Sequence, residues 1–181
     1  MVRRVAVAAV ASRTRPVVAV VGHARETVEK ALAGLPIHVA FNADFASGLA
    51  SSLRTGLAAL PQTVAGAVIL LGDMPKVESG LIDALIKSFS ANPDVLAAAP
   101  IQNGRRGNPI LLSRALFAKA MRLSGDEGAR PLLSGLDATQ LIEVACDHWD
   151  ASFDVDRPCD LETVQRHLSA AEESAATDKF Y

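Results

Sequence analysis

The segment Leu71-Gly72-Asp73-Met74-Pro75 combines residue types that suit chemistry on a phosphate group. Asp73 follows an apolar run over 64–71, which predicts a buried strand in the middle of a sheet. A carboxylate just after such a strand lies at the ligand-binding edge of an α/β sheet, and Gly72 lets a substrate come close. Mg²⁺ prefers carboxylate oxygens and keeps phosphate oxygens as further ligands. The pattern favours Asp73 as a metal ligand over the alternative that it only caps the next helix.

A second acidic pair, Asp154 and Asp156, follows a strand-like residue pattern. Alternation along an extended segment places both carboxylates on one side of the chain. They could hold a divalent ion together, or one could bind the ion and the other support it. Asp156 could also cap a helix that Pro158 begins, and this role is compatible with metal binding.

Small and hydroxyl-bearing residues open the predicted helix at 47–60. Gly48, Ser51 and Ser52 would place free backbone N–H groups and hydroxyls at its N-terminus, where a phosphate or a base edge can bind. Glycine and serine also begin many helices that bind nothing, so this signal is weak by itself.

Two further polar segments could contact an anionic substrate. Arg105, Arg106 and Asn108 form a compact group able to hold an anion, although a solvated hairpin tip would look the same. The segment 124–130, which includes Gly128 and Arg130, could be only a turn with capping carboxylates between two helices.

Strands and helices alternate along most of the chain. Strands are predicted at 17–21, 37–41, 64–71, 95–99, 110–112 and 140–145, and helices at 2–10, 24–33, 47–60, 79–90, 113–122, 127–136 and 159–170. Asn103-Gly104 predicts a hairpin turn after the fourth strand. This rhythm is typical of an α/β fold with a doubly wound, mostly parallel sheet and helices on both faces.

Composition excludes several classes of function. The net charge of the 181 residues is −2 and no basic run occurs, which argues against nucleic acid as a partner. No stretch approaches the roughly 20 apolar residues needed to span a bilayer, and the first residues lack the pattern of a signal peptide, so we expect no membrane partner and a cytoplasmic location. The two cysteines lack CxxC spacing and are expected to be reduced thiols. The four histidines are scattered, and no Gly-x-Ser-x-Gly elbow indicates a hydrolase.

Six segments in order resemble the molybdenum-cofactor nucleotidyltransferases, the MobA-like NTP transferases that attach CMP or GMP to molybdopterin. The cytidylyltransferase branch is the nearest match, and the similarity runs from the first helix to about residue 168. The segments are Val20-Val21-Gly22-His23-Ala24, Asn42 with 48–53, 71–75, Gly104-Arg105-Arg106-Gly107-Asn108-Pro109, 124–130 and Asp154-Val155-Asp156-Arg157-Pro158.

The resemblance implies a role for each segment. The implied metal ligands, and the catalytic positions, are Asp73 and Asp156, with Asp154 as a further ligand. The implied nucleotide-binding residues are Asn42, Gly48, Ser51, Ser52 and Gly72. The implied acceptor-binding residues are Arg105, Arg106, Gly107, Asn108, Gly128 and Arg130. The implied cofactor is Mg²⁺, and the implied partners are CTP or GTP, molybdopterin and a molybdenum hydroxylase.

The chain departs from this family at its start. Family members begin with a strand and a loop of the type Leu-Ala-Ala-Gly-x-Ser-x-Arg-Met-Gly, whose amides surround phosphates. Here residue 2 already lies in the helix expected after that loop. The resemblance therefore implies a domain over 1–170 that lacks its first strand and is N-terminally incomplete, followed by a polar tail at 171–181. The absent strand would lie between those at 17–21 and 64–71.

Two alternatives to cytidylyl or guanylyl transfer remain at this point. The chain could be a non-catalytic module that binds the molybdenum cofactor and delivers it to an enzyme. It could also be a nucleotidyltransferase for another phosphorylated acceptor, such as a sugar or polyol phosphate.

Overall fold

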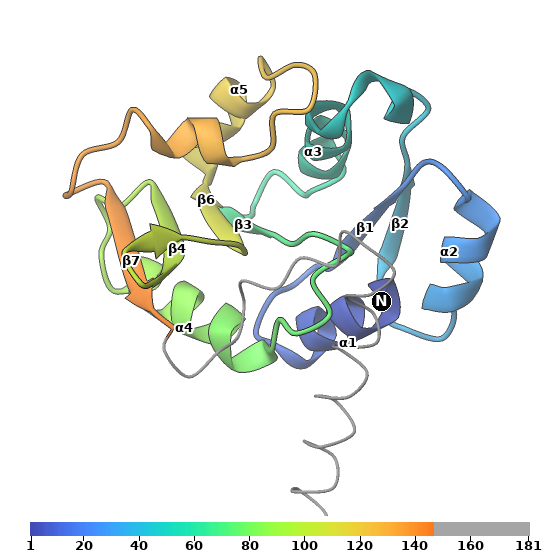
Figure 1. Ribbon diagram of the computed structural model, residues 1–181, viewed down its shortest axis with the longest axis horizontal. Coiled ribbons are helices and arrows are strands. Elements are labelled where there is room, and N and C mark those ends of the chain that lie inside the picture. Colours follow the sequence, from blue (N-terminus) through green and yellow to red (C-terminus); the bar gives the residue numbers. More distant parts are fainter. Residues whose placement is uncertain (147–181) are drawn as a thin grey trace, which may run out of the picture.

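The computed structural model describes residues 1–146 of the chain, and these residues form a mixed α/β fold (Figure 1). The helices are α1 (Val2–Ala11), α2 (Arg25–Leu32), α3 (Leu49–Ala58), α4 (Ser79–Ser90) and α5 (Phe117–Ala120), with 3-10 turns η1 (Phe45–Ser47), η2 (Arg114–Leu116) and η3 (Arg130–Leu133). The strands are β1 (Val18–Val21), β2 (His38–Phe41), β3 (Gly66–Ile69), β4 (Ala97–Gln102), β5 (Arg105–Arg106), β6 (Ile110–Ser113) and β7 (Leu141–Ala145). The α/β class predicted from the sequence is confirmed.

The strands form two separate sheets. β1 and β2 pair in parallel as a two-stranded sheet, in which Val18 lies opposite His38. The other five strands run in the order β3-β6-β4-β5, and β7 pairs with β4. β6 is antiparallel to both β3 and β4, whereas β7 is parallel to β4. The larger sheet is therefore mixed. β6 follows the β4–β5 hairpin in the chain and runs antiparallel to both of its neighbours.

Alternate residues of β4 and β6 face opposite helical layers. Ala97, Ala99 and Leu112 pack with residues of α3 and α5 in one core cluster. Ala98 and Leu111 pack instead with Leu85 of α4 in another. Figure 1 shows these layers, with α3 and α5 on one side of the sheet and α4 and α1 on the other. Period-two alternation with both faces covered makes these strands the core of the fold.

The strongest sequence patterns agree with the observed elements. α4 spans 79–90 as predicted, and its apolar face buries Leu81, Ile82 and Leu85 completely. The predicted hairpin turn is present: Asn103 and Gly104 both have positive φ, 51° and 73°, as a two-residue turn between antiparallel strands requires. α1 begins at residue 2 as expected and buries Val5 and Ala9.

Two predictions need correction. The helix predicted at 127–136 is only the short 3-10 turn η3, because Pro131 stands where a regular helix would need its N–H, and Gly128 and Gly135 flank the turn. The strand at 64–71 is shorter, 66–69, and lies at the edge of its sheet within the described residues. The predicted helix at 159–170, Asp154, Asp156 and the tail at 171–181 lie outside the described residues.

Candidate functional site

Several of the predicted site residues line one cavity. This central cavity has a volume of about 1070 Å³ and lies among β1, β3, α3 and the segment 126–131. The predicted site residues in its wall are Ser52, Gly72, Asn108, Gly128 and Arg130. They come from four separate segments of the sequence, so the fold brings together most of the motifs that the sequence singled out.

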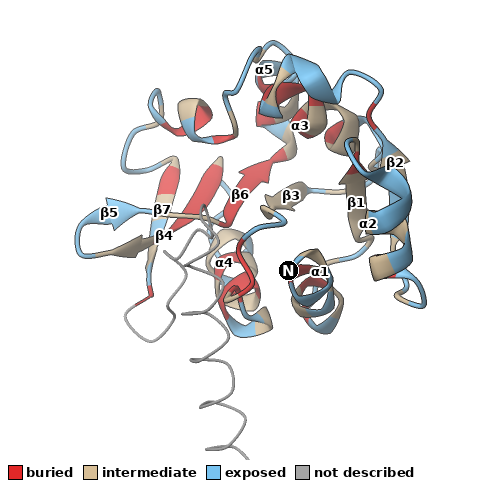
Figure 2. Ribbon diagram, turned by 45° about the vertical axis from the view of Figure 1, so that its right-hand side comes forward, coloured by how far each residue is buried: buried red, intermediate tan, exposed pale blue. Residues whose placement is uncertain are grey.

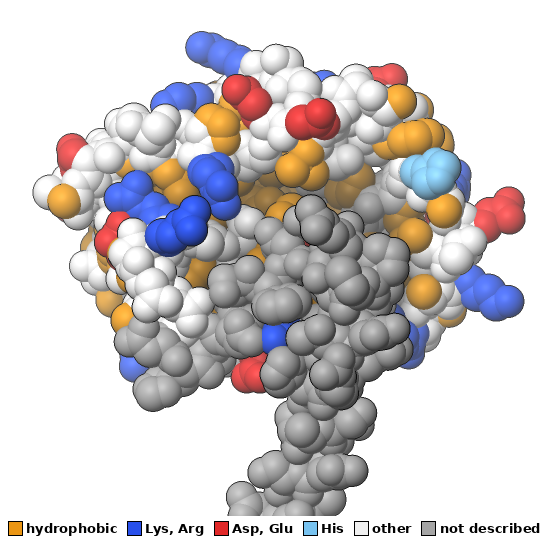
Figure 3. Space-filling view, viewed as in Figure 1, with side chains coloured by type: hydrophobic (Ala, Val, Ile, Leu, Met, Phe, Trp, Pro, Cys, Tyr) orange, Lys and Arg blue, Asp and Glu red, His pale blue; other side chains and the backbone are white. Residues whose placement is uncertain are grey.

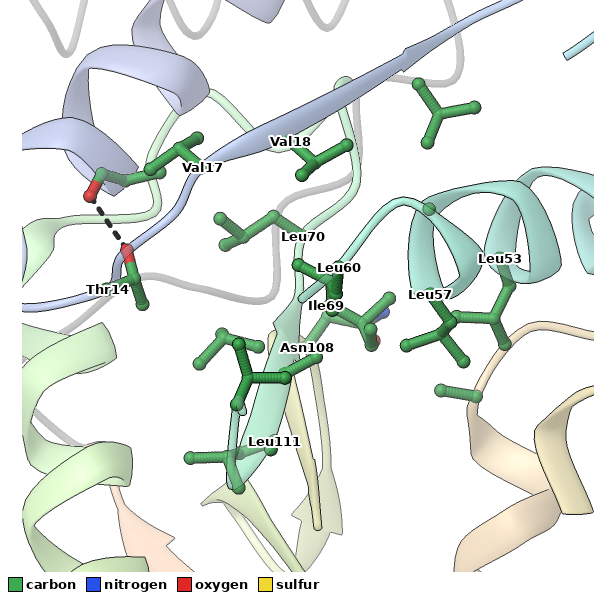
Figure 4. Close-up of a pocket in the computed structure, with 18 of the residues that line it drawn as sticks. Thr14, Val17, Val18, Leu53, Leu57, Leu60, Ile69, Leu70, Asn108 and Leu111 are labelled. Carbon is green, nitrogen blue, oxygen red and sulfur yellow. Dashed lines mark hydrogen bonds between the residues drawn. The ribbon is translucent and has the colours of Figure 1, made fainter. Parts of the chain in front are cut away.

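The wall of the central cavity is mainly apolar, with charged groups toward solvent. Val18, Leu53 and Ile69 lie in its wall, and Figure 4 shows them with Asn108. Asp126 and Glu127 also line it and are exposed, as is Arg130. In the space-filling view, hydrophobic side chains lie in the central hollow and acidic and basic side chains surround it (Figure 3). Such a cavity can hold an apolar body with charged groups at its mouth.

A buried amide joins the end of β2 to the start of α3. Asn42, only 3% exposed, donates from Nδ2 to the hydroxyls of Ser51 at 2.8 Å and Ser52 at 3.1 Å. Its Oδ1 accepts the N–H of Asp44 at 3.0 Å. Three of the predicted nucleotide-binding residues are thus hydrogen-bonded to one another. Asn42 and Ser51 are buried, so Ser52, which lines the cavity, is the member placed to meet a ligand directly.

The turn before α3 lies directly against the segment 124–130. Gly48 has φ of +102°, and a Cβ there would collide with the carbonyl group of Gly125. The N–H of Ala50 donates to that carbonyl at 3.0 Å. Only glycine allows this backbone conformation and this close approach. The predicted nucleotide-side turn and the predicted acceptor-side segment are therefore in contact, 77 residues apart in the sequence.

Asp73 lies in an exposed turn after β3, where the sequence placed it. Its neighbour Gly72 lies beside α1, because a Cβ at Gly72 would be 3.6 Å from Cγ2 of Val2. Within residues 1–146, no three His, Cys, Asp or Glu side chains are grouped so that they could hold a metal ion. Asp73 is thus a single carboxylate, and its predicted partners Asp154 and Asp156 lie outside the described residues.

Arg105 and Arg106, two of the predicted acceptor-binding arginines, do not lie in the wall of the central cavity. Arg105 and Arg106 form β5, are exposed, and pair with the end of β4. Nε of Arg106 is 2.6 Å from Oε1 of Glu143 on β7. Gly107 is bonded through its N–H to Pro100. Of the hairpin segment 105–108, only Asn108 reaches the cavity, so the structure separates residues that the sequence placed together.

Sequence reasoning did not assign Leu49, Asp126 or Glu127 to the site, although all three line the cavity. Asp126 and Glu127 had the alternative role of capping residues. In the sequence, the position of Asp126 and Glu127 between Gly125 and Gly128 was the available indication of a role. The contact between Gly125 and Gly48 then shows that this segment lies beside the first turn of α3.

Residues 1–144 match the family described as the MobA-like NTP transferase domain. The chain belongs to this family. The match covers every described strand except the end of β7, and it includes all the segments around the central cavity. The coarse prediction of a nucleotidyltransferase is confirmed at the level of the family.

Solved structures similar to this family member support the same fold. A complex of Rv0371c with manganese from Mycobacterium tuberculosis H37Rv is 25% identical, with a TM-score of 0.75 over 90% of this chain and 83% of that one. A nucleotidyl transferase from Methanothermobacter is 20% identical, with a TM-score of 0.80 over 94% and 81%. Molybdopterin-guanine dinucleotide biosynthesis protein A from Archaeoglobus fulgidus is 16% identical, with a TM-score of 0.61 over 84% and 78%. No curated protein matches the chain. No helix within residues 1–146 is long and apolar enough to cross a membrane.

The donor chemistry of this MobA-like chain fits a hard divalent cation. An exposed carboxylate at the end of a strand offers oxygen without the desolvation that a buried carboxylate would suffer. Mg²⁺ is usually held by one or two carboxylates together with waters and substrate phosphates, so a complete cage of protein ligands is not required. A single exposed carboxylate such as that of Asp73 can therefore be part of such a site.

Proposed function

We propose that this protein transfers CMP, or alternatively GMP, from the nucleoside triphosphate to molybdopterin and releases pyrophosphate. The observation that carries the proposal is the meeting of nucleotide-side and acceptor-side residues around one cavity, Ser52 and Gly72 with Asn108, Gly128 and Arg130. Family membership supports nucleotidyl transfer, and the order of the sequence motifs supports molybdopterin as acceptor.

The proposed reaction exchanges one phosphoanhydride bond for another. An oxygen of the terminal phosphate of molybdopterin attacks the α-phosphorus of CTP, and the bond from that phosphorus to the β-phosphate oxygen breaks. The electron pair leaves with pyrophosphate. Phosphoryl transfer of this type depends on positioning and on neutralising charge rather than on a covalent nucleophile. The cavity offers positioning groups and no described nucleophile with a paired base.

Each part of the site then has a task. Ser52 and the backbone at Gly72 contact the nucleotide, while Asn42, Ser51 and Gly48 hold the first turn of α3 in place. Asn108, Gly128 and Arg130 face the acceptor in the same cavity. Arg105, Arg106 and Gly107 form the hairpin next to Asn108 and attract the anionic acceptor from outside the cavity.

Asp73, with Asp154 and Asp156, would hold Mg²⁺ in this proposal. The ion, when bound, neutralises the negative charge of the triphosphate. Support for a divalent cation comes from the exposed carboxylate after β3 and from the manganese complex of the 25% identical mycobacterial protein.

The decisive experiment measures pyrophosphate release by the full chain with Mg²⁺ and molybdopterin. CTP, GTP and ATP are compared, and we expect release with CTP to exceed release with GTP, and none with ATP. No release with any of the three, under conditions where a family member known to be active releases pyrophosphate, would refute the proposal.

The metal role is tested with Asp73→Asn. We expect its affinity for Mn²⁺ in the presence of CTP to fall at least about tenfold, because a neutral amide oxygen replaces a charged ligand. The matched control is Asp94→Asn, which removes an exposed carboxylate from the α4–β4 turn. Equal Mn²⁺ affinity in Asp73→Asn and the parent chain would contradict the assignment.

One observation favours a second candidate, transfer to another phosphorylated acceptor. Arg106 is already paired with Glu143, so the pair of arginines expected to hold molybdopterin contributes only one unpaired guanidinium in the hairpin. Pyrophosphate release with a sugar or polyol phosphate but not with molybdopterin would establish this alternative. Binding of molybdopterin with no turnover would instead favour a module that delivers the cofactor to a molybdenum hydroxylase.

A further inference from the structure

Leu49 differs from the other leucines and valines in the wall of the central cavity because it is exposed. The residue is 41% exposed, while Leu53 on the same helix is 7% exposed. Residues at i, i+3 and i+4 share one face of a helix, so Leu49, Ser52 and Leu53 form one strip along the cavity wall. Burial rises along this strip from Leu49 through the half-buried Ser52 to Leu53. Leu49 therefore lies at the mouth of the cavity, and Ser52 lies deeper.

Gly128 leaves room for the side chain of Leu49. A Cβ at Gly128 would lie 3.1 Å from Cδ2 of Leu49, which is closer than two carbon atoms pack favourably. Gly48 and Gly125 have positive φ, at +102° and +62°, whereas Gly128 does not. Space for the leucine methyl group, and not the backbone conformation, therefore accounts for glycine at position 128. The side chains at positions 49 and 128 form one size-matched pair.

The segment 126–130 brings charged side chains to the same mouth. Asp126, Glu127 and Arg130 are exposed and line the cavity. The segment is held at its start, where the carbonyl of Gly125 accepts an N–H from α3, and at its end, where η3 buries two leucines in the core. Leu49 therefore meets this segment between two fixed points, beside the charged groups.

The charged groups at the mouth do not select one acceptor by themselves. The guanidinium of Arg130 can bind a phosphate, and the carboxylates of Asp126 and Glu127 accept N–H or O–H donors. A phosphorylated heterocycle and a sugar phosphate both satisfy these groups. Leu49 distinguishes them, because hydroxyl groups placed against its methyl groups would lose hydrogen bonds to water. The face of an aromatic ring would instead bury apolar surface there.

We propose that Leu49 is the specificity-determining residue of the acceptor side of the site. Its side chain, set in place by the space at Gly128, packs against the planar ring of a phosphorylated heteroaromatic acceptor. This inference rests on the proposed function, in which the pterin of molybdopterin supplies that ring. Sugar and polyol phosphates are then poor acceptors. The nucleotide lies deeper in the cavity, beside Ser52, and does not contact Leu49.

Leu49→Asn tests the apolar contact, because asparagine is similar in size but polar. In the assay of pyrophosphate release with CTP and Mg²⁺, we expect the KM for molybdopterin to rise about tenfold, as when a small apolar contact is lost from a binding pocket. The KM for CTP and kcat should change much less. Leu49→Met, which keeps an apolar side chain, should restore most of the affinity for molybdopterin.

Met121→Asn is the matched control for this substitution. Met121 follows α5, is 45% exposed and does not line the central cavity. Its replacement also removes an exposed apolar side chain, but no substrate contact is lost. The KM for molybdopterin should therefore equal that of the parent chain. A rise as large as that of Leu49→Asn would show a general effect of surface polarity and would overturn the proposal.

Gly128→Val tests the size match between the two positions. The added methyl groups should displace the side chain of Leu49 from the ring and raise the KM for molybdopterin at least about tenfold. The double variant Leu49→Ala/Gly128→Val moves the same number of carbon atoms from one position to the other, so it should recover most of this loss. Effects of the two substitutions that simply multiply would overturn the matched pair, and the proposal with it.

The assay separates failure of this inference from failure of the proposed function. No pyrophosphate release by the parent chain with any acceptor would refute both. Release with molybdopterin, together with an unchanged KM in Leu49→Asn, would overturn only the inference. A rise in the KM for CTP as large as that for molybdopterin would place the nucleobase against Leu49 and would also overturn it. A KM of the parent chain for glucose 1-phosphate at or below that for molybdopterin would contradict the acceptor class.

Discussion

β6 and β3 are hydrogen-bonded neighbours, yet they are covered very differently. All four residues of Ile110–Ser113 are buried, whereas all four of Gly66–Ile69 are only half-buried (Figure 2). Both strands are apolar, and helices lie above and below both. Within residues 1–146, β6 has a strand on each side, β3 and β4, while β3 has a neighbour on one side. The burial of a strand in this fold therefore depends on its lateral neighbours as much as on the helical layers. We call strands β4–β7 the closed half of the fold, and strands β1–β3 with the residues that follow them, such as Asn42 and Leu70, the open half.

The largest effect is expected from Leu112→Ala in β6. Leu112 is fully buried in the cluster that includes α3 and α5 residues, so the substitution leaves a cavity that the closed half cannot fill. We expect the free energy of unfolding to fall by about 2–5 kcal/mol. Urea unfolding followed by circular dichroism measures this loss, and a loss below about 1 kcal/mol would show that the β4–β6 core is less tightly packed than described.

Asn42→Ala should have the next largest effect, although Asn42 belongs to the open half. The substitution removes the amide that donates to both Ser51 and Ser52 and that accepts the N–H of Asp44, and it leaves the buried hydroxyl of Ser51 with only the carbonyls of Asp44 and Gly48. We expect a loss of about 1–3 kcal/mol in the same measurement. Asn92→Ala is the control, since exposed Asn92 only bonds the carbonyl of Ser88. Equal losses of unfolding free energy in Asn42→Ala and Asn92→Ala would mean that the hydrogen bonds of Asn42 do not stabilise the junction between β2 and α3.

Leu70→Ala is the same substitution as Leu112→Ala, made in the open half of the fold. Leu70 is half-buried beside the central cavity, so less apolar surface leaves contact. We expect a loss of about 1 kcal/mol, roughly half of what full burial of a leucine contributes. A loss as large as that of Leu112→Ala would remove the distinction between the two halves.

Glu143→Gln should have the smallest effect. It breaks the exposed ion pair with Arg106 at the rim of the closed half, and exposed pairs contribute about 0–1 kcal/mol. A double-mutant cycle with Arg106→Gln isolates the pair energy from other effects. A coupling energy above about 2 kcal/mol would mean that charge pairing, and not only apolar packing, separates the closed half from the open half.

Local patterns predicted much of this fold because they act within one element. The i, i+4 spacing of apolar residues in α1 and α4 marks their buried faces, and Asn103-Gly104 specifies its turn by backbone preference alone. The segment 127–136 misled the prediction because its apolar spacing suggested a helix, while Pro131 and two glycines prevent more than one turn. The half-burial of β3 was invisible locally, since a strand's neighbours are set by the whole topology.

Several residues that the sequence proposed for the site line the central cavity, but the sequence did not show how those residues lie relative to one another. Gly72 and Asp73 lie in a turn after β3, as the strand pattern predicted, while their role in a site stays a prediction. The sequence could not show that Asn108 reaches the cavity while Arg105 and Arg106 do not, because a two-residue strand turns the hairpin away. Contact between Gly48 and Gly125 depends on chain folding across 77 residues, which no spacing rule contains. The meeting of Asp73 with Asp154 and Asp156 stays a prediction.

The contact between Gly48 and Gly125 has a thermodynamic consequence. Because each backbone stands in the space of the other, and Ala50 donates to Gly125, neither segment can shift without displacing its neighbour. A ligand that orders one segment therefore changes the free energy of ordering the other. Linkage makes this influence equal in both directions, so whatever a first substrate adds to the affinity for a second, the second must add to the affinity for the first.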